Sequence, residues 1–233
     1  MIVMPACSSG WIWHCLARET GRIGHLYSPG DQRGPWPWLP YACDNGAFSC
    51  WNQQDNTFDY DKWSTKEMEW KTLMLWTQTS GQEPLWAIAP DVPGQKDPTL
   101  EQWPKFAKLV VECGIPPALA VQDGMTKEDV DKLDPQPAVI AVGGTTEWKW
   151  DKVAYWARWY KRVHVLRCNR PNKLAWLEEL GIESCDGTGW NRGDRTQTQG
   201  LEEWARSRGT PRFDLLSPHV CRQPKQKKQI QFA

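Results

Sequence analysis

The chain has 233 residues, a formal net charge of zero, 40% hydrophobic side chains and 24% charged side chains. This composition excludes a disordered chain, and no apolar window is long enough to cross a membrane, so we expect one soluble globular domain. The first residues lack the basic and apolar regions of a signal peptide. We therefore expect a cytoplasmic protein without membrane contact.

Eight cysteines are scattered along the chain without a C-x-x-C pair. This spacing favours reduced cysteines over a disulfide framework or a zinc cluster. We therefore expect no bound metal and no cofactor. Charge is uneven, because the segment from Arg192 to the end has nine Lys and Arg against four acids, a net charge of +5. Such a segment fits a polyanionic partner, although a solvated tail gives the same pattern.

Short apolar runs bounded by turn residues predict eight strands, which begin near residues 2, 41, 85, 118, 138, 163, 182 and 213. Helical spacing of apolar residues predicts helices over 11–18, 61–79, 99–113, 126–133, 148–160, 171–180 and 200–207. Four prolines in the stretch 27–40 predict a long ordered loop instead of regular structure.

The alternation of strands and helices predicts an α/β fold, a single (β/α)8 TIM-like barrel over residues 1–217. Residues 218–233 are polar and basic, and we expect a flexible C-terminal tail there. A doubly wound open sheet remains the alternative, because periodicity does not distinguish a closed sheet from an open one.

Polar or glycine residues follow most of the predicted middle strands: Asp44, Asp91, Gln122, Gly143-Gly144 and Asp186. In a barrel these positions converge on one mouth. Carboxylates, an amide and exposed glycine backbone suit a planar ligand with several N–H donors, such as guanine. Each aspartate alone is explained by capping of its own loop, but five such positions in one register are not.

In these positions the chain resembles the tRNA-guanine transglycosylases and their DNA-acting paralogues. Five short motifs carry the resemblance over about residues 41–195: Asp44-Asn45-Gly46-Ala47-Phe48, Asp91 before a proline-containing turn, Ala120-Val121-Gln122-Asp123-Gly124, Ala141-Val142-Gly143-Gly144, and Asp186 with Arg192 and Arg195 six and nine positions later.

The resemblance implies catalytic roles for two carboxylates. Asp186 would be the nucleophile that attacks C1′ and holds a covalent glycosyl intermediate. Asp44 would exchange protons with the outgoing and incoming base.

The resemblance also implies a binding site. The guanine edge would be read by Asp91, Gln122 and the backbone of Gly143 and Gly144. The flipped base would lie between Phe48 and Leu166, while Arg192 and Arg195 would hold the flanking phosphates.

Two departures qualify the resemblance. The family's C-x-C-x-x-C zinc cluster is absent, and His219 with Cys221 cannot form a four-ligand site, so we expect a barrel without the zinc subdomain. The family has a glycine-rich turn after its sixth strand. In this chain Arg167-Cys168-Asn169 stands in its place, after the predicted strand near residue 163. Because the tRNA-acting members grip tRNA with the zinc subdomain, its absence favours the DNA-acting branch, found in phages and bacterial modification islands.

We therefore expect exchange of guanine in DNA for a 7-deazaguanine base such as 7-cyano-7-deazaguanine, in a bacterial or phage-infected cytoplasm. A partner protein or a homodimer is compatible with the sequence. Three alternatives stay open: the same chemistry on tRNA, a non-catalytic nucleic-acid-binding barrel, and a hydrolase that only removes a base.

Overall fold

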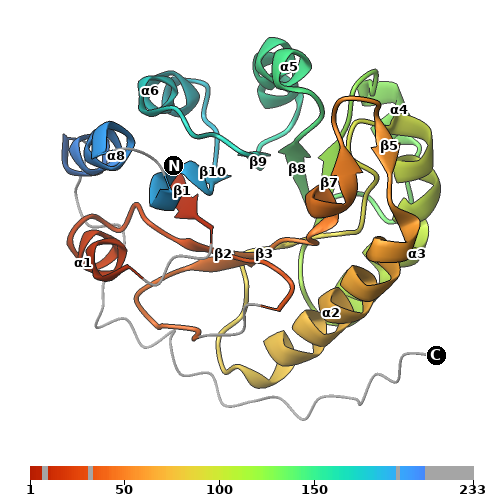
Figure 1. The fold of residues 1–233 in the computed structure, drawn as a ribbon, viewed down its shortest axis with the longest axis horizontal. Helices are drawn as coiled ribbons and strands as arrows, with labels where there is room; N and C mark the ends of the chain where they lie inside the picture. Colours follow the sequence, from red (N-terminus) through yellow and green to blue (C-terminus); the bar gives the residue numbers. More distant parts are fainter. Residues whose placement is uncertain (7–9, 31–33, 193–194, 208–233) are drawn as a thin grey trace.

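Eight parallel strands form a barrel at the centre of the computed structural model, which describes residues 1–6, 10–30, 34–192 and 195–207 (Figure 1). In their order around the barrel, the strands are β1 (Ile2–Pro5), β2 (His25–Tyr27), β3 (Tyr41–Cys43), β6 (Ala87–Ile88), β7 (Pro117–Val121), β8 (Val139–Val142), β9 (Val163–Val165) and β10 (Ser184–Gly187). Neighbours in the barrel are thus neighbours in the chain, which is the topology of a (β/α)8 barrel.

Backbone hydrogen bonds between β1 and the residues just before β2 close the barrel. The amide of Val3 donates to the carbonyl of Arg22 over 2.8 Å, and the amide of Gly24 donates to the carbonyl of Val3 over 2.9 Å. Parallel bridges join Val3 to Ile23 and Ala6 to Leu26. The open doubly wound sheet is therefore excluded, and the predicted barrel is confirmed.

Helices surround the barrel as an outer layer (Figure 1). They are α1 (Trp11–Thr20), α2 (Tyr60–Thr79), α3 (Lys96–Glu112), α4 (Lys127–Asp131), α5 (Thr146–Trp159), α6 (Pro171–Glu179), the short α7 (Gly189–Arg192) and α8 (Arg195–Ser207). After β3 the chain forms a 3₁₀ turn, η1 (Ala47–Cys50), and a small antiparallel hairpin of β4 (Trp51–Asn52) and β5 (Thr57–Phe58). None of the described helices has the length and apolar character that crossing a membrane requires.

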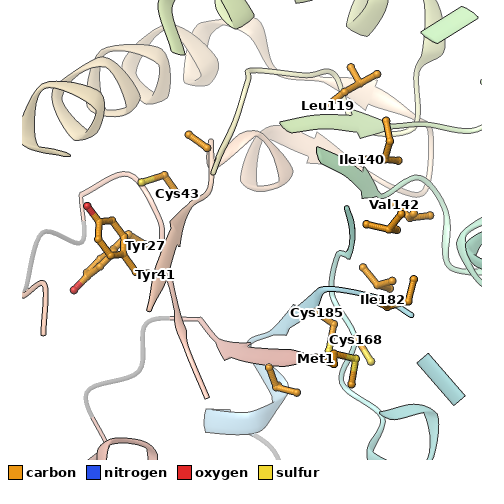
Figure 2. Packing of buried hydrophobic residues seen from close by; sticks show 14 of the residues in the cluster. Met1, Tyr27, Tyr41, Cys43, Leu119, Ile140, Val142, Cys168, Ile182 and Cys185 are labelled. Carbon is orange, nitrogen blue, oxygen red and sulfur yellow. The ribbon is translucent and has the colours of Figure 1, made fainter. Parts of the chain in front are cut away.

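The main hydrophobic core lies between the strands and the helices. Figure 2 shows Leu119, Ile140 and Val142 pointing outward from β7 and β8, and all three are buried. They pack in one cluster with helix side chains such as Trp103 and Trp156. The chain has 17 tryptophans, and many of their large indoles fill this layer.

A second, smaller core fills the inside of the barrel. Its members alternate along the strands with the outward residues and include no helix side chain: Met4, Leu26, Ala42, Trp86, Ile88, Ala118, Ala120, Val139 and Ala141. Successive side chains of a strand point to opposite faces, so these positions face the barrel axis. The interior of the barrel is therefore a packed core, and it supports the residues at the ends of the strands.

One barrel strand, β2, was missing from the prediction, as was the hairpin of β4 and β5. β2 begins with the polar His25, so only Leu26 and Tyr27 form an apolar run, which is too short to predict a strand. Tyr27, which the sequence placed at the start of the proline-rich loop, is the last residue of this strand. The predicted strand near residue 213 and the predicted tail 218–233 lie outside the described residues.

The two-layer packing gives a test of stability. Leu119 is 1% exposed between β7 and the helix layer, whereas Met68 on α2 is 64% exposed. We expect Leu119→Ala to lower the free energy of unfolding by about 2–5 kcal/mol, because it removes buried methyl groups and leaves a cavity. Met68→Ala should change it by less than about 0.5 kcal/mol. Urea denaturation measures both, and equal losses would contradict the packing described.

Candidate active site

A cavity of about 430 Å³ opens at the mouth where the strands end. Eight of the predicted site residues line it: Asp44, Phe48, Asp91, Gln122, Gly143, Gly144, Leu166 and Asp186. They come from the ends of six different strands or from the loops that follow them. The structure thus brings together residues that are spread over more than 140 positions of the sequence.

The strand period explains why these residues meet. Ala42, Ala120 and Ala141 belong to the inner core. Asp44, Gln122 and Gly143 each follow one of these alanines by two residues. They therefore also face the barrel axis, in the next layer towards the mouth. The inner core forms the floor beneath them, and the polar layer above it lines the cavity.

Asp186 is held by two hydrogen bonds to one oxygen. Its Oδ1 lies 3.1 Å from Nε2 of His164 and accepts a 2.9 Å bond from the backbone amide of Arg167. The other ring nitrogen of His164, Nδ1, lies 2.8 Å from Oγ of Ser184. Asp186 is only 6% exposed, and His164 and Ser184 are fully buried. The carboxylate is therefore fixed in orientation through Oδ1, which leaves Oδ2 as the oxygen for a ligand.

Asp44 is the second carboxylate of the cavity. Burial, followed by the negative charge of Asp186, raises the pKa of Asp44 to about 6, against an ordinary value of 3.8. Hydrogen bonds from the backbone of Asn45 and Gly46 and from Ser28 lower it in part. A carboxyl group with a pKa near neutrality can both release and accept a proton under ordinary conditions.

Asp91 accepts amide hydrogen bonds on both of its oxygens. Nδ2 of Asn45 donates to Oδ1 and Nε2 of Gln122 donates to Oδ2, each over 2.6 Å. Burial nevertheless raises the pKa of Asp91 to about 7. Asn45 also donates to the carbonyl of Ala89 over 3.0 Å and accepts from the amide of Ala47 over 2.8 Å. The carboxylate therefore lies in a rigid amide frame.

Gln122 connects the loops after three neighbouring strands. Its Oε1 accepts backbone amides from Gly94, over 2.8 Å, and from Gly144, over 3.0 Å. The amide of Gly143 donates to the carbonyl of Val121 over 3.0 Å. Gly144 has φ of +69°, and a Cβ atom there would collide with the carboxylate of Asp123, so only glycine fits this turn. The Gly144 amide is thus engaged by Gln122 in the structure.

Arg167 is the main positive group inside the cavity. Its guanidinium lies 4.3 Å from the ring centroid of Phe48 and donates to the carbonyl of Gly144. Its φ is +55°, a left-handed conformation that is unusual for a residue with a side chain. The guanidinium therefore covers one face of the ring that the resemblance assigns to base stacking. A planar guanidinium can itself stack on a base.

Lys149 is a buried cation in the wall of the cavity. Its Nζ donates to the carbonyl of Leu166 over 2.7 Å and to that of Arg167 over 3.2 Å. Burial, with the nearby positive charge of Arg167, lowers the pKa of Lys149 to about 8. By fixing these two carbonyls, Lys149 fixes the turn whose amide holds Asp186.

The two predicted phosphate-binding arginines lie on α7 and α8. Arg192 ends α7, and its side chain lies outside the described part of the structure, while Arg195 begins α8 and is exposed. The described lining of the cavity includes neither residue.

Sequence reasoning missed three functional candidates: His164, Lys149 and the side chain of Arg167. His164 interrupts the apolar run of β9, and that interruption was the available signal.

The described residues contain no group of three or more His, Cys, Asp and Glu side chains arranged to hold a metal ion. No family model matches the sequence, and a search of curated proteins gives no match either.

The raised pKa of Asp91 predicts a pH dependence of stability. The native state binds this proton more tightly than the unfolded chain, where the pKa is 3.8. The resulting stabilisation is complete below about pH 4 and is lost as the pH rises through 7. We therefore expect Asp91→Asn to gain stability relative to the wild type between pH 4 and pH 8, by more than about 1 kcal/mol.

Urea denaturation at several pH values measures this difference. Asp151→Asn, which changes an exposed aspartate of α5, is the control and should show a constant difference. A constant difference for Asp91→Asn as well would contradict the raised pKa.

Proposed function

We propose that the protein is a transglycosylase that exchanges guanine in DNA for a 7-deazaguanine base through a covalent aspartyl-glycosyl intermediate. The observation that carries the proposal is the meeting of Asp44, Asp186 and the Asp91–Gln122 pair in one cavity. The choice of DNA and of a 7-deazaguanine rests on the resemblance of the motifs to the DNA-acting transglycosylases.

In the first half of the reaction, Oδ2 of Asp186 attacks C1′ of the target nucleotide. The bond between C1′ and N9 breaks, and its electron pair leaves with the guanine. Asp44, protonated, gives its proton to the departing base. The pKa of about 6 supports this role, because a useful fraction of Asp44 still carries a proton near neutral pH.

In the second half, the incoming base binds in place of guanine. Asp44 removes the proton from N9, and N9 attacks C1′. The ester bond to Asp186 breaks, and the carboxylate is restored. Two displacements at one carbon retain the configuration of the sugar.

The Asp91–Gln122 pair suits the edge of a guanine. Guanine and 7-deazaguanines present N–H donors at N1 and N2, and Asp91 is a carboxylate acceptor at the cavity wall. Asn45 and Gln122 hold Asp91 in place, so the acceptor costs little to orient. A base carbonyl would replace Oε1 of Gln122 as the acceptor for the Gly144 amide.

The test is incorporation of labelled guanine and of labelled 7-cyano-7-deazaguanine into DNA and into tRNA. We expect incorporation into DNA by the wild type and a loss of at least about a thousandfold in Asp186→Asn, which keeps the shape but not the nucleophile. Asp151→Asn should retain activity. Without an incoming base, the wild type should form a covalent protein–DNA adduct that survives denaturation.

The other outcomes identify the alternatives. Incorporation into tRNA alone would indicate a transglycosylase with the same mechanism that acts on tRNA instead of DNA. Release of guanine without incorporation would indicate a hydrolase. Nucleic-acid binding that is equal in wild type and Asp186→Asn, without any exchange, would indicate a non-catalytic barrel.

His164 supplies a second test of the mechanism. If His164 orients Asp186, His164→Asn should lower kcat about 10- to 100-fold, as expected for the loss of a hydrogen bond to a charged group, and leave KM nearly unchanged. His14→Gln is the control, since His14 lies on α1 next to Trp38. A rise in KM with an unchanged kcat would argue against this positioning role.

A further inference from the structure

A cluster of aromatic and basic side chains lies at the rim of the cavity, on α5 and at the start of α6. It consists of Trp150, Arg170, Lys173 and Trp176, which we call the α5–α6 rim. Trp150 and Arg170 also line the cavity, so the rim is continuous with it. The two helices are neighbours in the outer layer (Figure 1).

The rim is built from cation–aromatic contacts. Nζ of Lys173 lies 5.4 Å from the ring centroid of Trp150 and 4.9 Å from that of Trp176. The two indole rings are 6.3 Å apart with an angle of 50° between their planes. Both indoles are only partly buried, so they combine a fixed position with accessible surface.

Two residues of the rim, Arg170 and Lys173, carry a positive charge. Within the described part of the chain, neither Arg170 nor Lys173 forms an ion pair with a carboxylate. Two further cations line the same cavity: Lys149, which is buried, and Arg167, which is partly buried.

Three carboxylates also line the cavity: Asp186 on β10, and Asp44 and Asp91, which follow β3 and β6 on the side of the barrel away from β9. A polyanion would be repelled by these carboxylates and attracted to the rim.

We propose that the α5–α6 rim binds a single-stranded segment of nucleic acid beside the nucleotide whose base enters the cavity. Arg170 and Lys173 contact phosphates, and an indole of the pair stacks on a flanking base. The proposal rests on the proposed function for the base in the cavity, but the binding itself requires no exchange.

The chemistry of the rim selects a single strand. Phosphate contacts alone would serve a duplex equally well, because both present the same charged backbone. The indoles have stacking partners only where bases are unstacked, and base–aromatic stacking tolerates any base. Phosphate contacts next to exposed aromatic rings are therefore the combination that single-strand sites use.

The test is binding of a labelled 12-nucleotide DNA strand, its RNA equivalent and the matching DNA duplex, each over a range of salt concentrations. We expect the wild type to prefer the single strands. Lys173→Ala and Arg170→Ala should each weaken binding and reduce the number of phosphate contacts, read from the salt slope, by about one. Lys152→Ala, on the same helix as Trp150 but paired with Asp151, should change neither quantity.

The tryptophans are tested separately from the charges. Trp176→Ala should weaken single-strand binding about 5- to 100-fold with an unchanged salt slope, and Trp176→Phe should recover most of the affinity. Trp159→Ala, which removes an indole that is 49% exposed at the far end of α5, is the matched control.

Equal binding by the rim variants and their controls would overturn the inference, as would a preference for duplex. Preference for the RNA strand over the DNA strand would leave the rim assignment intact and change only the sugar that it accepts. Rim-dependent binding without any base exchange would support this inference while contradicting the proposed function. Base exchange that is unaffected by Arg170→Ala and Lys173→Ala would support the proposed function and contradict this inference.

Discussion

The candidate site depends on the two-residue period of parallel strands in a closed barrel. Each strand alternates between the helix-facing core and the barrel axis, so the residue two positions beyond an inner core residue must face the cavity. Closure through β1 and β2 brings all eight strand ends to one ring. If the pairing register of a strand shifted by one residue, the polar residue at its end would point into the apolar core between the strands and the helices. Fold and site are therefore determined by the same alternation.

Burial of three carboxylates is the electrostatic cost of this arrangement. The cost is partly met by donors that the fold provides: the backbone amide of Arg167 and His164 for Asp186, and two side-chain amides for Asp91. For Asp44 and Asp91 the donors do not offset burial in full, because their pKa values lie at about 6 and about 7, above the ordinary value of 3.8. Lys149 and Arg167 supply the opposite charge within the same cavity.

Much of this architecture was accessible from the sequence because its signals are local. Apolar runs such as 138–142 and helical spacing such as 99–113 report burial directly, and polar residues at strand ends mark the mouth of a barrel. β2 was missed because its polar first residue, His25, leaves only two consecutive apolar residues, Leu26 and Tyr27.

Lys149 was missed for a different reason. Its position on α5 reads as an ordinary surface lysine, and its burial follows only from how α5 packs against the turn after β9. The interactions of His164 likewise depend on the neighbouring strand, since Ser184 is its register partner on β10. Contacts between elements distant in sequence carry no local signal, so they had to come from the structure.

Gln122 illustrates a further consequence. One end of its amide receives two backbone N–H groups, and the other end donates to a carboxylate. Glutamate keeps the receiving end but places a second negative charge against Asp91, and methionine keeps the length but provides neither donor nor acceptor. No other amino acid combines both functions at this reach. In a saturation library, position 122 should therefore accept fewer substitutions than the apolar core beneath it, where shape alone is required.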